Sequence, residues 1–154
     1  MEKTTLAALM VCAMLVFFLP TVTRLFLKFQ RKGKLRNIVS GAKTLSLRQF
    51  FDLREQYRGR MKAVDFVGVY IIYNQSKKMY YVGQSIHVLS RVNAHFTGKG
   101  NGDVYADYKY GDRFVIRLVK LRGSGYSRLD DLERELIEMY HCCEKGYNRK
   151  KGNK

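Results

Sequence analysis

Two short strand-like tripeptides decide the fold of this chain, Gly68-Val69-Tyr70 and Tyr81-Val82-Gly83. Their tyrosines lie eleven positions apart, on either side of the polar break Asn74-Gln75-Ser76-Lys77-Lys78. Runs of apolar, β-branched and aromatic residues flank this break, a pattern typical of two strands joined by a hairpin turn. The sequence therefore predicts a β-hairpin that brings both phenols to one surface.

The residues around this hairpin predict a small α+β domain over residues 63–154. We expect strands at 66–73, 79–82 and 114–121, helices at 86–96 and 129–142, and a glycine-rich loop after the first helix. The last helix has apolar residues at helical spacing, namely Leu129, Leu132, Leu136, Met139 and Tyr140. The predicted architecture is a mixed or antiparallel three-stranded sheet flanked by helices.

The composition indicates one domain with a polyanionic partner. The 154 residues carry 29 Lys and Arg against 13 Asp and Glu, a formal net charge of +16, which is far more than solubility requires. Nucleic acid and anionic lipid are both polyanions that such a charge would bind. The three cysteines, Cys12, Cys142 and Cys143, show no CxxC spacing and no paired framework, which favours a reducing compartment.

An uncharged segment from Thr4 to Thr23 is dominated by Leu, Ala, Val, Met and Phe. A helix needs about 20 such residues to cross a bilayer, so residues 1–27 are predicted to form a transmembrane helix that anchors the chain. A cleaved signal peptide is the alternative, but basic residues follow directly from Arg24 and no convincing A-x-A site is present. Positive residues stay cytoplasmic, which predicts a single-pass inner-membrane protein with its C-terminal domain in the cytoplasm.

Residues 28–62 are predicted to be a basic juxtamembrane connector. Between residues 24 and 62 there are twelve Lys and Arg residues and two acidic ones. Such a segment can lie on anionic lipid headgroups, at about 1 kcal/mol per basic residue, or act as a nucleic-acid arm; the lack of aromatic residues between Gln30 and Gln49 favours lipid. Within it, Ser46-Leu47-Arg48-Gln49 resembles a capping box and predicts a helix that ends near Gly59.

Polar residues follow the two tripeptides at ordered intervals: Arg91, His95, Glu133 and Asn148. Together with the tripeptides, this order resembles the GIY-YIG nuclease superfamily over residues 65–148. The resemblance implies a small sheet flanked by helices, and an endonuclease that hydrolyses phosphodiester bonds. That reaction needs a base that activates water, positive charge that stabilises the pentacovalent phosphate and, in most cases, a divalent metal.

The resemblance gives roles to four candidate catalytic residues. Tyr70 would be the general base, although a phenol with a pKa of about 10 needs nearby cations to act as one at neutral pH. Tyr81 would be a second active-site phenol, and Arg91 would clamp the scissile phosphate through bidentate bonds. His95 lies on the same helix face as Arg91 and would donate to phosphate or relay a proton. Without the resemblance, the tyrosines would be ordinary strand packing and Arg91 a solvated charge.

Glu133 would be the single metal ligand, because one carboxylate with substrate oxygens and water suits Mg²⁺ or the similar Mn²⁺. Glu138 is the alternative if the phase of the helix differs. Five further residues would bind nucleic acid or support the site: Gly68, Gly83, Gln84, Lys99 and Asn148. The glycines would leave the sheet surface open to a closely approaching backbone. Some relatives carry lysine where this chain has Gln84, and Lys99 in the glycine-rich loop could supply that cation instead.

These observations lead to a membrane-anchored, metal-dependent endonuclease that acts on DNA. A tethered nuclease would favour DNA entering the cell, so a role in defence against phage or plasmid DNA follows from the topology alone. The residues do not discriminate DNA from RNA, and they leave the oligomeric state open. The alternative function is a catalytically silent nucleic-acid-binding or scaffolding protein at the membrane that keeps the fold and the basic surface.

Overall fold

The structure is a computed structural model that describes residues 2–152, with the side chains of residues 18–27 and 29–152. Within these residues the chain forms seven helices: α1 (Glu2–Ser40), α2 (Leu47–Gln56), α3 (Met61–Val64), α4 (Val88–Phe96), α5 (Gly102–Tyr110), α6 (Leu129–Met139) and α7 (Cys142–Lys145). It also forms four strands: β1 (Lys43–Ser46), β2 (Gly68–Asn74), β3 (Met79–Ser85) and β4 (Phe114–Lys120). The chain divides into two units, residues 1–37 and 38–154, and the sheet belongs to the second.

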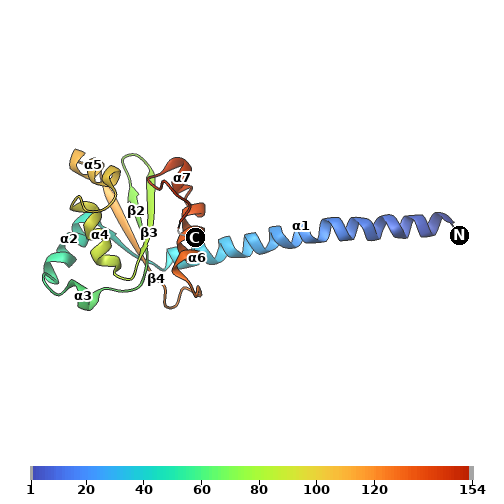
Figure 1. The fold of residues 1–154 in the computed structure, drawn as a ribbon, viewed down its shortest axis with the longest axis horizontal. Coiled ribbons are helices and arrows are strands. Elements are labelled where there is room, and N and C mark those ends of the chain that lie inside the picture. The colour runs from blue at the N-terminus through green and yellow to red at the C-terminus, as the bar shows by residue number, and fades with distance from the viewer. Residues whose placement is uncertain (1, 153–154) are drawn as a thin grey trace. The chain divides into compact units, whose positions relative to one another are not determined.

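The predicted hairpin is confirmed as β2 and β3, which pair antiparallel and form one side of the sheet (Figure 1). Their register runs from Gly68 opposite Ser85 to Asn74 opposite Met79, and it places Tyr70 opposite Gly83. The sheet order is β1-β4-β2-β3, and every neighbouring pair is antiparallel. The α+β class is therefore confirmed, and β3 lies at the edge of the sheet beside the strand that carries Tyr70.

The expected number of strands was wrong, because the described part of the chain contains four strands and not three. The additional strand is β1, which pairs with β4. It is only four residues long, and Leu45 alone among them is buried, so no alternating apolar pattern marks it in the sequence. Directly after it, Ser46 forms the predicted capping box with Gln49 and begins α2. Both elements belong to the compact unit from Ile38 onward.

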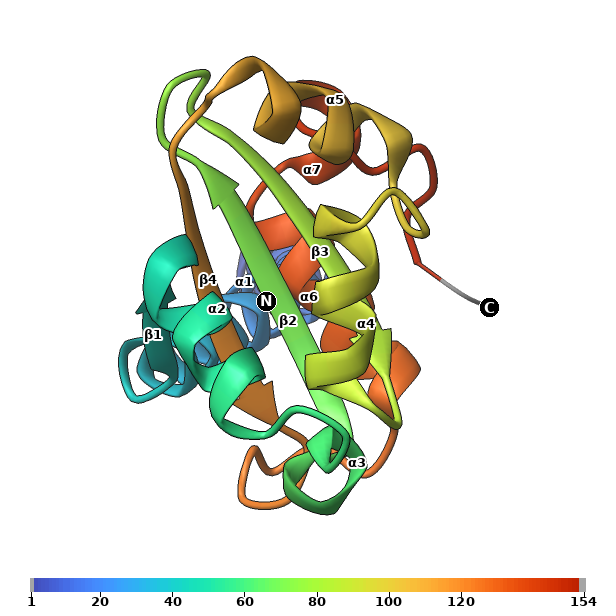
Figure 2. The same ribbon diagram turned by 90° about the vertical axis from the view of Figure 1, so that its left-hand side faces the viewer.

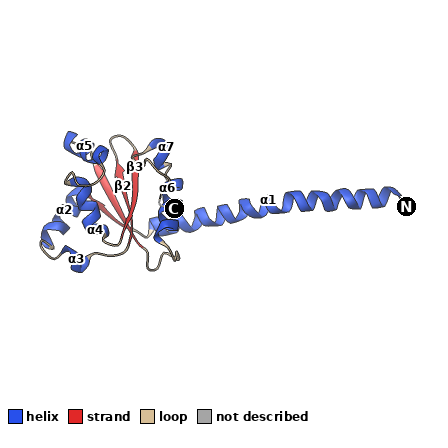
Figure 3. Cartoon of the chain, viewed as in Figure 1, coloured by secondary structure: helices blue, strands red, loops and turns tan. Residues whose placement is uncertain are grey.

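Helices cover both faces of the sheet (Figures 1 and 3). In Figure 2, α2 and α4 lie in front of the strands and α6 lies behind them. The front layer encloses a core that includes Phe50, Tyr70, Ile72, Val88, Val92, Phe96 and Ile116. On the other face α6 buries Leu132 and Leu136 of the expected apolar stripe, together with Ile137, while Leu129, Met139 and Tyr140 are partly buried. The edge strand β3 thus has α4 on one side and α6 on the other.

Helix α5 replaces part of what was predicted to be a glycine-rich loop. Asn101 is its N-cap, and its side-chain oxygen accepts hydrogen bonds from the N–H groups of Asp103 and Val104. The helix ends at Gly111, which adopts a left-handed conformation. Helix α5 could not be predicted from the sequence pattern, because glycines lie on either side of Lys99 and Asn101 and glycine is a poor helix former.

Helix α1 includes the segment that was predicted to be a transmembrane anchor. Most of the predicted span, Thr4–Thr23, lies outside the residues whose side chains are described. Among the residues that the structure describes, no helix is both long enough and apolar enough to cross a membrane. In the described side chains of α1, the uncharged stretch 18–23 is followed by Arg24 and by further basic residues along the helix. The predictions of a membrane anchor and of an inner-membrane localisation were therefore wrong. The contact of the connector with lipid stays a prediction.

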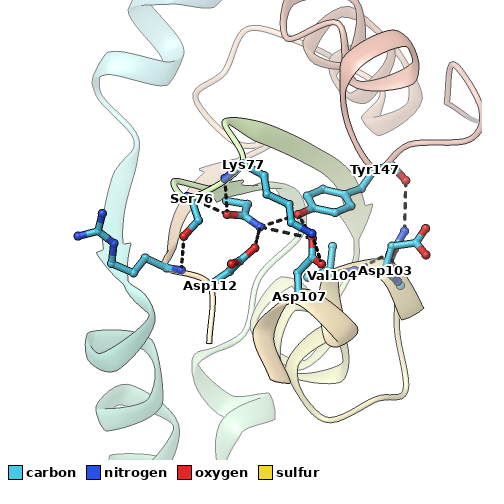
Figure 4. Close-up of polar contacts among 10 residues, drawn as sticks. Ser76, Lys77, Asp103, Val104, Asp107, Asp112 and Tyr147 are labelled. Atoms are coloured by element: carbon cyan, nitrogen blue, oxygen red, sulfur yellow. Dashed lines mark hydrogen bonds and ion pairs between the residues drawn. The ribbon is translucent and has the colours of Figure 1, made fainter. Parts of the chain in front are cut away.

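A partly buried polar network holds the turn end of the hairpin against α5 and the C-terminal segment (Figure 4). The buried amide of Asn74 donates to Asp112 and to the Tyr147 hydroxyl, both at 2.7 Å. Tyr147 donates to Asp107 at 2.6 Å, and Lys77 pairs with the same carboxylate at 2.6 Å. Partial burial raises the pKa of Asp107, but its bonds from Lys77 and Tyr147 more than offset this and hold it below its usual value. The network therefore fixes the ends of the strands that carry the tyrosines.

Candidate active site

Tyr70 lies in the middle of the sheet, and the register of the hairpin decides what faces it. A Cβ atom at Gly83, on the neighbouring strand, would collide with the Tyr70 hydroxyl. Gly83 therefore makes room for the hydroxyl of Tyr70. Gly68 has a similar internal role, because a Cβ atom there would collide with the backbone carbonyl of Val119 on β4. The expectation that both glycines admit a substrate backbone stays a prediction.

Three aromatic rings gather beside Gly83 on the α4 side of the sheet. The ring centroid of Tyr70 lies 6.1 Å from that of Tyr81 and 5.4 Å from that of His95. Tyr81 and His95 are closer still, at 4.8 Å. The Tyr70 hydroxyl oxygen lies 2.9 Å from His95 Nε2, and both side chains are buried. The structure thus brings these three predicted catalytic side chains together, and we call Tyr70, Tyr81 and His95 the aromatic cluster. The fourth, Arg91, is close enough for its charge to shift the pKa values of all three.

The loop after α4 fixes the tautomer of His95. The backbone N–H of Asn101 donates to His95 Nδ1 at 2.8 Å, and an N–H can only donate. Nδ1 therefore carries no proton, so the proton of the neutral ring is on Nε2 and is donated to the Tyr70 oxygen. A Cβ atom at Gly100 would lie 2.6 Å from His95 Nδ1, so the loop can close over the ring only with glycine there. Both ring nitrogens are thus bonded within the protein.

Burial and the nearby charges keep the His95 ring and the Tyr70 hydroxyl neutral at pH 7. Burial lowers the pKa of His95 to about 4, and the positive charge of Arg91 lowers it further in the same direction. Burial raises the pKa of Tyr70 well above its usual value and Tyr81 adds to the rise, while Arg91 opposes it. Arg91 is therefore the nearby cation that a base role for Tyr70 requires. In the structure, however, burial raises the pKa of Tyr70 by more than Arg91 lowers it.

Arg91 is exposed on α4, one helical turn before His95. Its helix starts without a capping side chain at His87. Instead, the carboxylate of Asp65 accepts hydrogen bonds from the N–H groups of Leu89 and Ser90, at 2.7 and 3.0 Å, and from the Ser90 hydroxyl at 2.7 Å. Asp65 therefore accepts hydrogen bonds from N–H groups in the first turn of α4 that have no partner within the helix, and it connects this turn to the start of β2.

We expect Asp65→Ala to lower the free energy of unfolding by about 1–2 kcal/mol, the usual effect of losing a helix cap. Urea unfolding followed by circular dichroism would measure it. Asp52→Ala is the matched control, because Asp52 is an exposed aspartate on α2 and such surface changes stay within about 0.5 kcal/mol. Equal stability of the two variants would show that the Asp65 bonds do not hold α4 in place.

Glu133 lies on α6, on the opposite side of β3 from His95. It is only 7% exposed, and its Oε2 accepts a hydrogen bond from Gln84 Nε2 at 3.0 Å. Burial raises the pKa of Tyr81, and the negative charge of Glu133 raises it further. The Glu133 carboxylate therefore acts electrostatically on the aromatic cluster from across β3. Glu138, the alternative metal ligand, is exposed on the same helix. The helix phase therefore turns Glu133 toward β3.

The two remaining predicted residues lie on either side of this centre. The side chain of Asn148 bonds both backbone groups of Val82: its oxygen accepts from the N–H at 2.9 Å and its amide donates to the carbonyl at 2.7 Å. Asn148 thus pairs with the outer edge of β3, as a neighbouring strand would, and supports the strand between Tyr81 and Gly83. Lys99 is exposed on the loop that closes over His95.

Four residues of this arrangement were not predicted to be part of the site: Asp65, Gly100, Asn101 and Asp130, which accepts a hydrogen bond from Gln84 Nε2 at 2.7 Å. Asn101 carries a usable signal, because asparagine before a helical stretch is a favoured N-cap. Asp130 lies three residues before Glu133 on a helix that was predicted, so it shares a face with Glu133. Asp65 and Gly100 carry no local signal, since their partners are fixed only when α4 and its loop fold against β2.

A family model described as the GIY-YIG catalytic domain matches residues 66–148. The matched range contains every residue that the sequence analysis assigned to the site. No curated protein matches the chain, and no solved structure matches it. Because the family model covers more than half of the 154 residues, the chain belongs to the GIY-YIG family of nucleases, which are phosphodiester hydrolases acting on nucleic acid.

Proposed function

We propose that this protein is a metal-dependent endonuclease that cuts DNA at the aromatic cluster. The observation that carries the proposal is the 2.9 Å contact between the Tyr70 hydroxyl and His95 Nε2, with the opposite ring nitrogen held by Asn101. A pair of packing residues would not need a fixed tautomer. A tyrosine that handles a proton does, because a donor aimed at its oxygen stabilises the negative charge of the phenolate.

Tyr70 would orient the attacking water and take its proton. A tyrosine is almost wholly protonated at neutral pH, and burial makes the phenolate of Tyr70 rarer still, while two groups act to increase its share. His95 donates Nε2–H to the oxygen, and Arg91 lowers the pKa of the phenol through its charge. The same guanidinium is exposed and would clamp the scissile phosphate, where two N–H groups can bond two oxygens.

Glu133 would hold the divalent cation, which we propose is Mg²⁺ or Mn²⁺. GIY-YIG nucleases generally depend on a divalent metal, and when bound it stabilises negative charge on the phosphate and the leaving oxygen. No group of three or more His, Cys, Asp or Glu within the described residues could hold a metal ion. One buried carboxylate nevertheless fits Mg²⁺, which keeps several waters and takes further oxygens from the substrate.

DNA is the proposed substrate because of the charge of the chain. A formal net charge of +16 provides strong attraction to a phosphate backbone without any sequence preference. The predicted defence role had the membrane anchor as its only basis, and it is not part of this proposal now that the anchor has been corrected.

The test is cleavage of supercoiled plasmid by the full chain with Mg²⁺ or Mn²⁺. We expect Arg91→Ala and Glu133→Gln to slow cleavage by about 10²–10³-fold, the usual effect of removing one group that stabilises charge in the transition state. Arg122→Ala is the matched control, because Arg122 is also an exposed arginine but lies on the loop after β4. A parallel reaction with duplex RNA compares the two substrates.

Wild-type protein that binds the plasmid but leaves it intact with every metal would contradict the proposal. It would favour the alternative, a silent nucleic-acid-binding protein. Equal losses of activity in Arg122→Ala and Arg91→Ala would contradict the phosphate clamp, since general loss of positive charge would then explain both.

A further inference from the structure

Gln84 follows Gly83 on β3 and, by strand alternation, its side chain lies on the α6 side of the sheet. Its amide nitrogen lies 2.7 Å from Asp130 Oδ1 and 3.0 Å from Glu133 Oε2. A carboxamide nitrogen carries two hydrogens, so Gln84 can donate one to each carboxylate. Asp130 and Glu133 are one helical turn apart on α6, and a single neutral group on the neighbouring strand therefore bridges them.

The bridge has an electrostatic consequence. Two carboxylates three residues apart on a helix repel each other, and Glu133 is buried, which adds a cost to its charge. The Gln84 amide offsets part of this cost through hydrogen bonds but adds no positive charge. Gln84 therefore neutralises neither carboxylate; Asp130 Oδ2 also pairs with the exposed Arg128 at 3.5 Å, which reduces but does not remove the negative charge beside Glu133. A lysine at this position would reach the same oxygens but would neutralise one charge and compete with the metal.

We propose that Gln84 is a positioning residue for the divalent metal. It fixes the plane of the Glu133 carboxylate through Oε2, and through Asp130 it keeps a second negative charge next to that ligand. The inference rests on the proposed function, because it takes Glu133 as the metal ligand. Outer groups that hold a metal ligand in this way typically change metal affinity or activity by about 10–100-fold when they are removed.

The test measures metal binding directly, without cleavage. Full-length protein is titrated with Mn²⁺ and free Mn²⁺ is followed by electron paramagnetic resonance. We expect Gln84→Met, which keeps the size of the side chain but cannot donate, to weaken Mn²⁺ binding by about 10–100-fold. Gln84→Lys should weaken it further, because an ammonium group then occupies the place between the carboxylates. Gln75→Met is the matched control, since Gln75 is an exposed glutamine in the hairpin turn.

Two controls separate metal positioning from general damage. Thermal unfolding without metal tests whether Gln84→Met remains folded. Asp130→Asn leaves β3 unchanged and keeps an oxygen acceptor for Gln84, and it should weaken Mn²⁺ binding by loss of charge. It therefore tests the second negative charge that the proposal places beside Glu133, even if Gln84→Met does not fold.

Two results would overturn the inference, and they are distinguishable. If Glu133→Gln weakens Mn²⁺ binding but Gln84→Met and Asp130→Asn do not, Glu133 is the ligand and the bridge has no role in holding it. If Glu133→Gln binds Mn²⁺ as tightly as the wild type, Glu133 is not the ligand, and the metal assignment of the proposed function fails together with the inference.

Discussion

Gly83→Ala is expected to slow nucleic-acid cleavage by about 10²–10⁴-fold, the range of a lost general base. It should also lower the free energy of unfolding by about 1–3 kcal/mol, because overfilling a packed site strains it. The added Cβ would collide with the Tyr70 hydroxyl and lie 2.6 Å from Tyr70 Cζ. Tyr70 is 1% exposed between the sheet and α4, so its ring has little space in which to move. The hydroxyl would therefore lose its contact with His95.

The chain offers a matched control for this substitution. Gly102 is the first residue of α5, and a Cβ atom there would have no neighbour within 4 Å. Gly102→Ala should therefore leave the cleavage rate unchanged and shift the free energy of unfolding by no more than about 0.5 kcal/mol. Plasmid cleavage gives the rate and urea unfolding by circular dichroism gives the stability, since the chain contains no tryptophan. A wild-type rate in Gly83→Ala would show that cleavage does not need the Tyr70 oxygen at this position.

The elements that the sequence predicted well are those whose signals are local. The hairpin depends on two runs of apolar, β-branched and aromatic residues around one polar turn, and both strands and their pairing were predicted from the residues between Phe66 and Ser85. The last long helix carries its own apolar stripe, which α6 buries on the sheet. In both cases the evidence lies within the element itself, so no distant contact is needed to recognise it.

The elements that were missed are stable only through distant partners. Strand β1 has one buried residue, Leu45, and its partner β4 begins at Phe114, far along the chain. Helix α5 begins with Gly102, closely follows Gly98 and Gly100, and buries only Val104. Neither segment has enough apolar periodicity to be recognised alone, because each is held by packing and hydrogen bonds to other parts of the domain.

The candidate site divides in the same way. The types and spacing of Tyr70, Arg91, His95 and Glu133 could be predicted from resemblance to a family. What surrounds them could not, because the partner of His95 Nδ1 is a backbone N–H and a backbone group has no sequence signature. The bond from Gln84 to Glu133 likewise joins residues 49 positions apart. These unpredicted contacts decide the protonation and orientation of the predicted side chains.

The stability of the fold is expected to fall by about 3 kcal/mol as the pH drops from 6.5 toward 4, through His95 alone. Burial, assisted by Arg91, lowers the pKa of His95 from 6.5 to about 4. Between these two pH values the unfolded chain binds a proton at this residue and the folded chain does not. The contribution is therefore complete above pH 6.5 and is lost as the pH falls to the folded pKa, at about 1.4 kcal/mol per pH unit.

Urea unfolding at a series of pH values from 7.5 to 4.5 would measure this loss. His95→Gln should remove most of it. His87→Gln should retain it, because His87 is an exposed histidine at the start of the same helix. The range stops at pH 4.5 because the lowered pKa of Asp107 adds a separate loss of stability below its usual value of 3.8. Identical pH dependence in the wild type and His95→Gln would contradict a buried, neutral His95.

The same protonation should also act on the site, and this links stability to chemistry. A second proton on His95 has to go to Nδ1, where the N–H of Asn101 already points. Two donors would then face each other, so the loop from Gly98 to Asn101 must move away or the ring must turn. Either movement breaks the geometry that aims Nε2–H at the Tyr70 oxygen. Cleavage and stability should therefore decline together on acidification, because one buried ring holds both the loop and the reactive phenol.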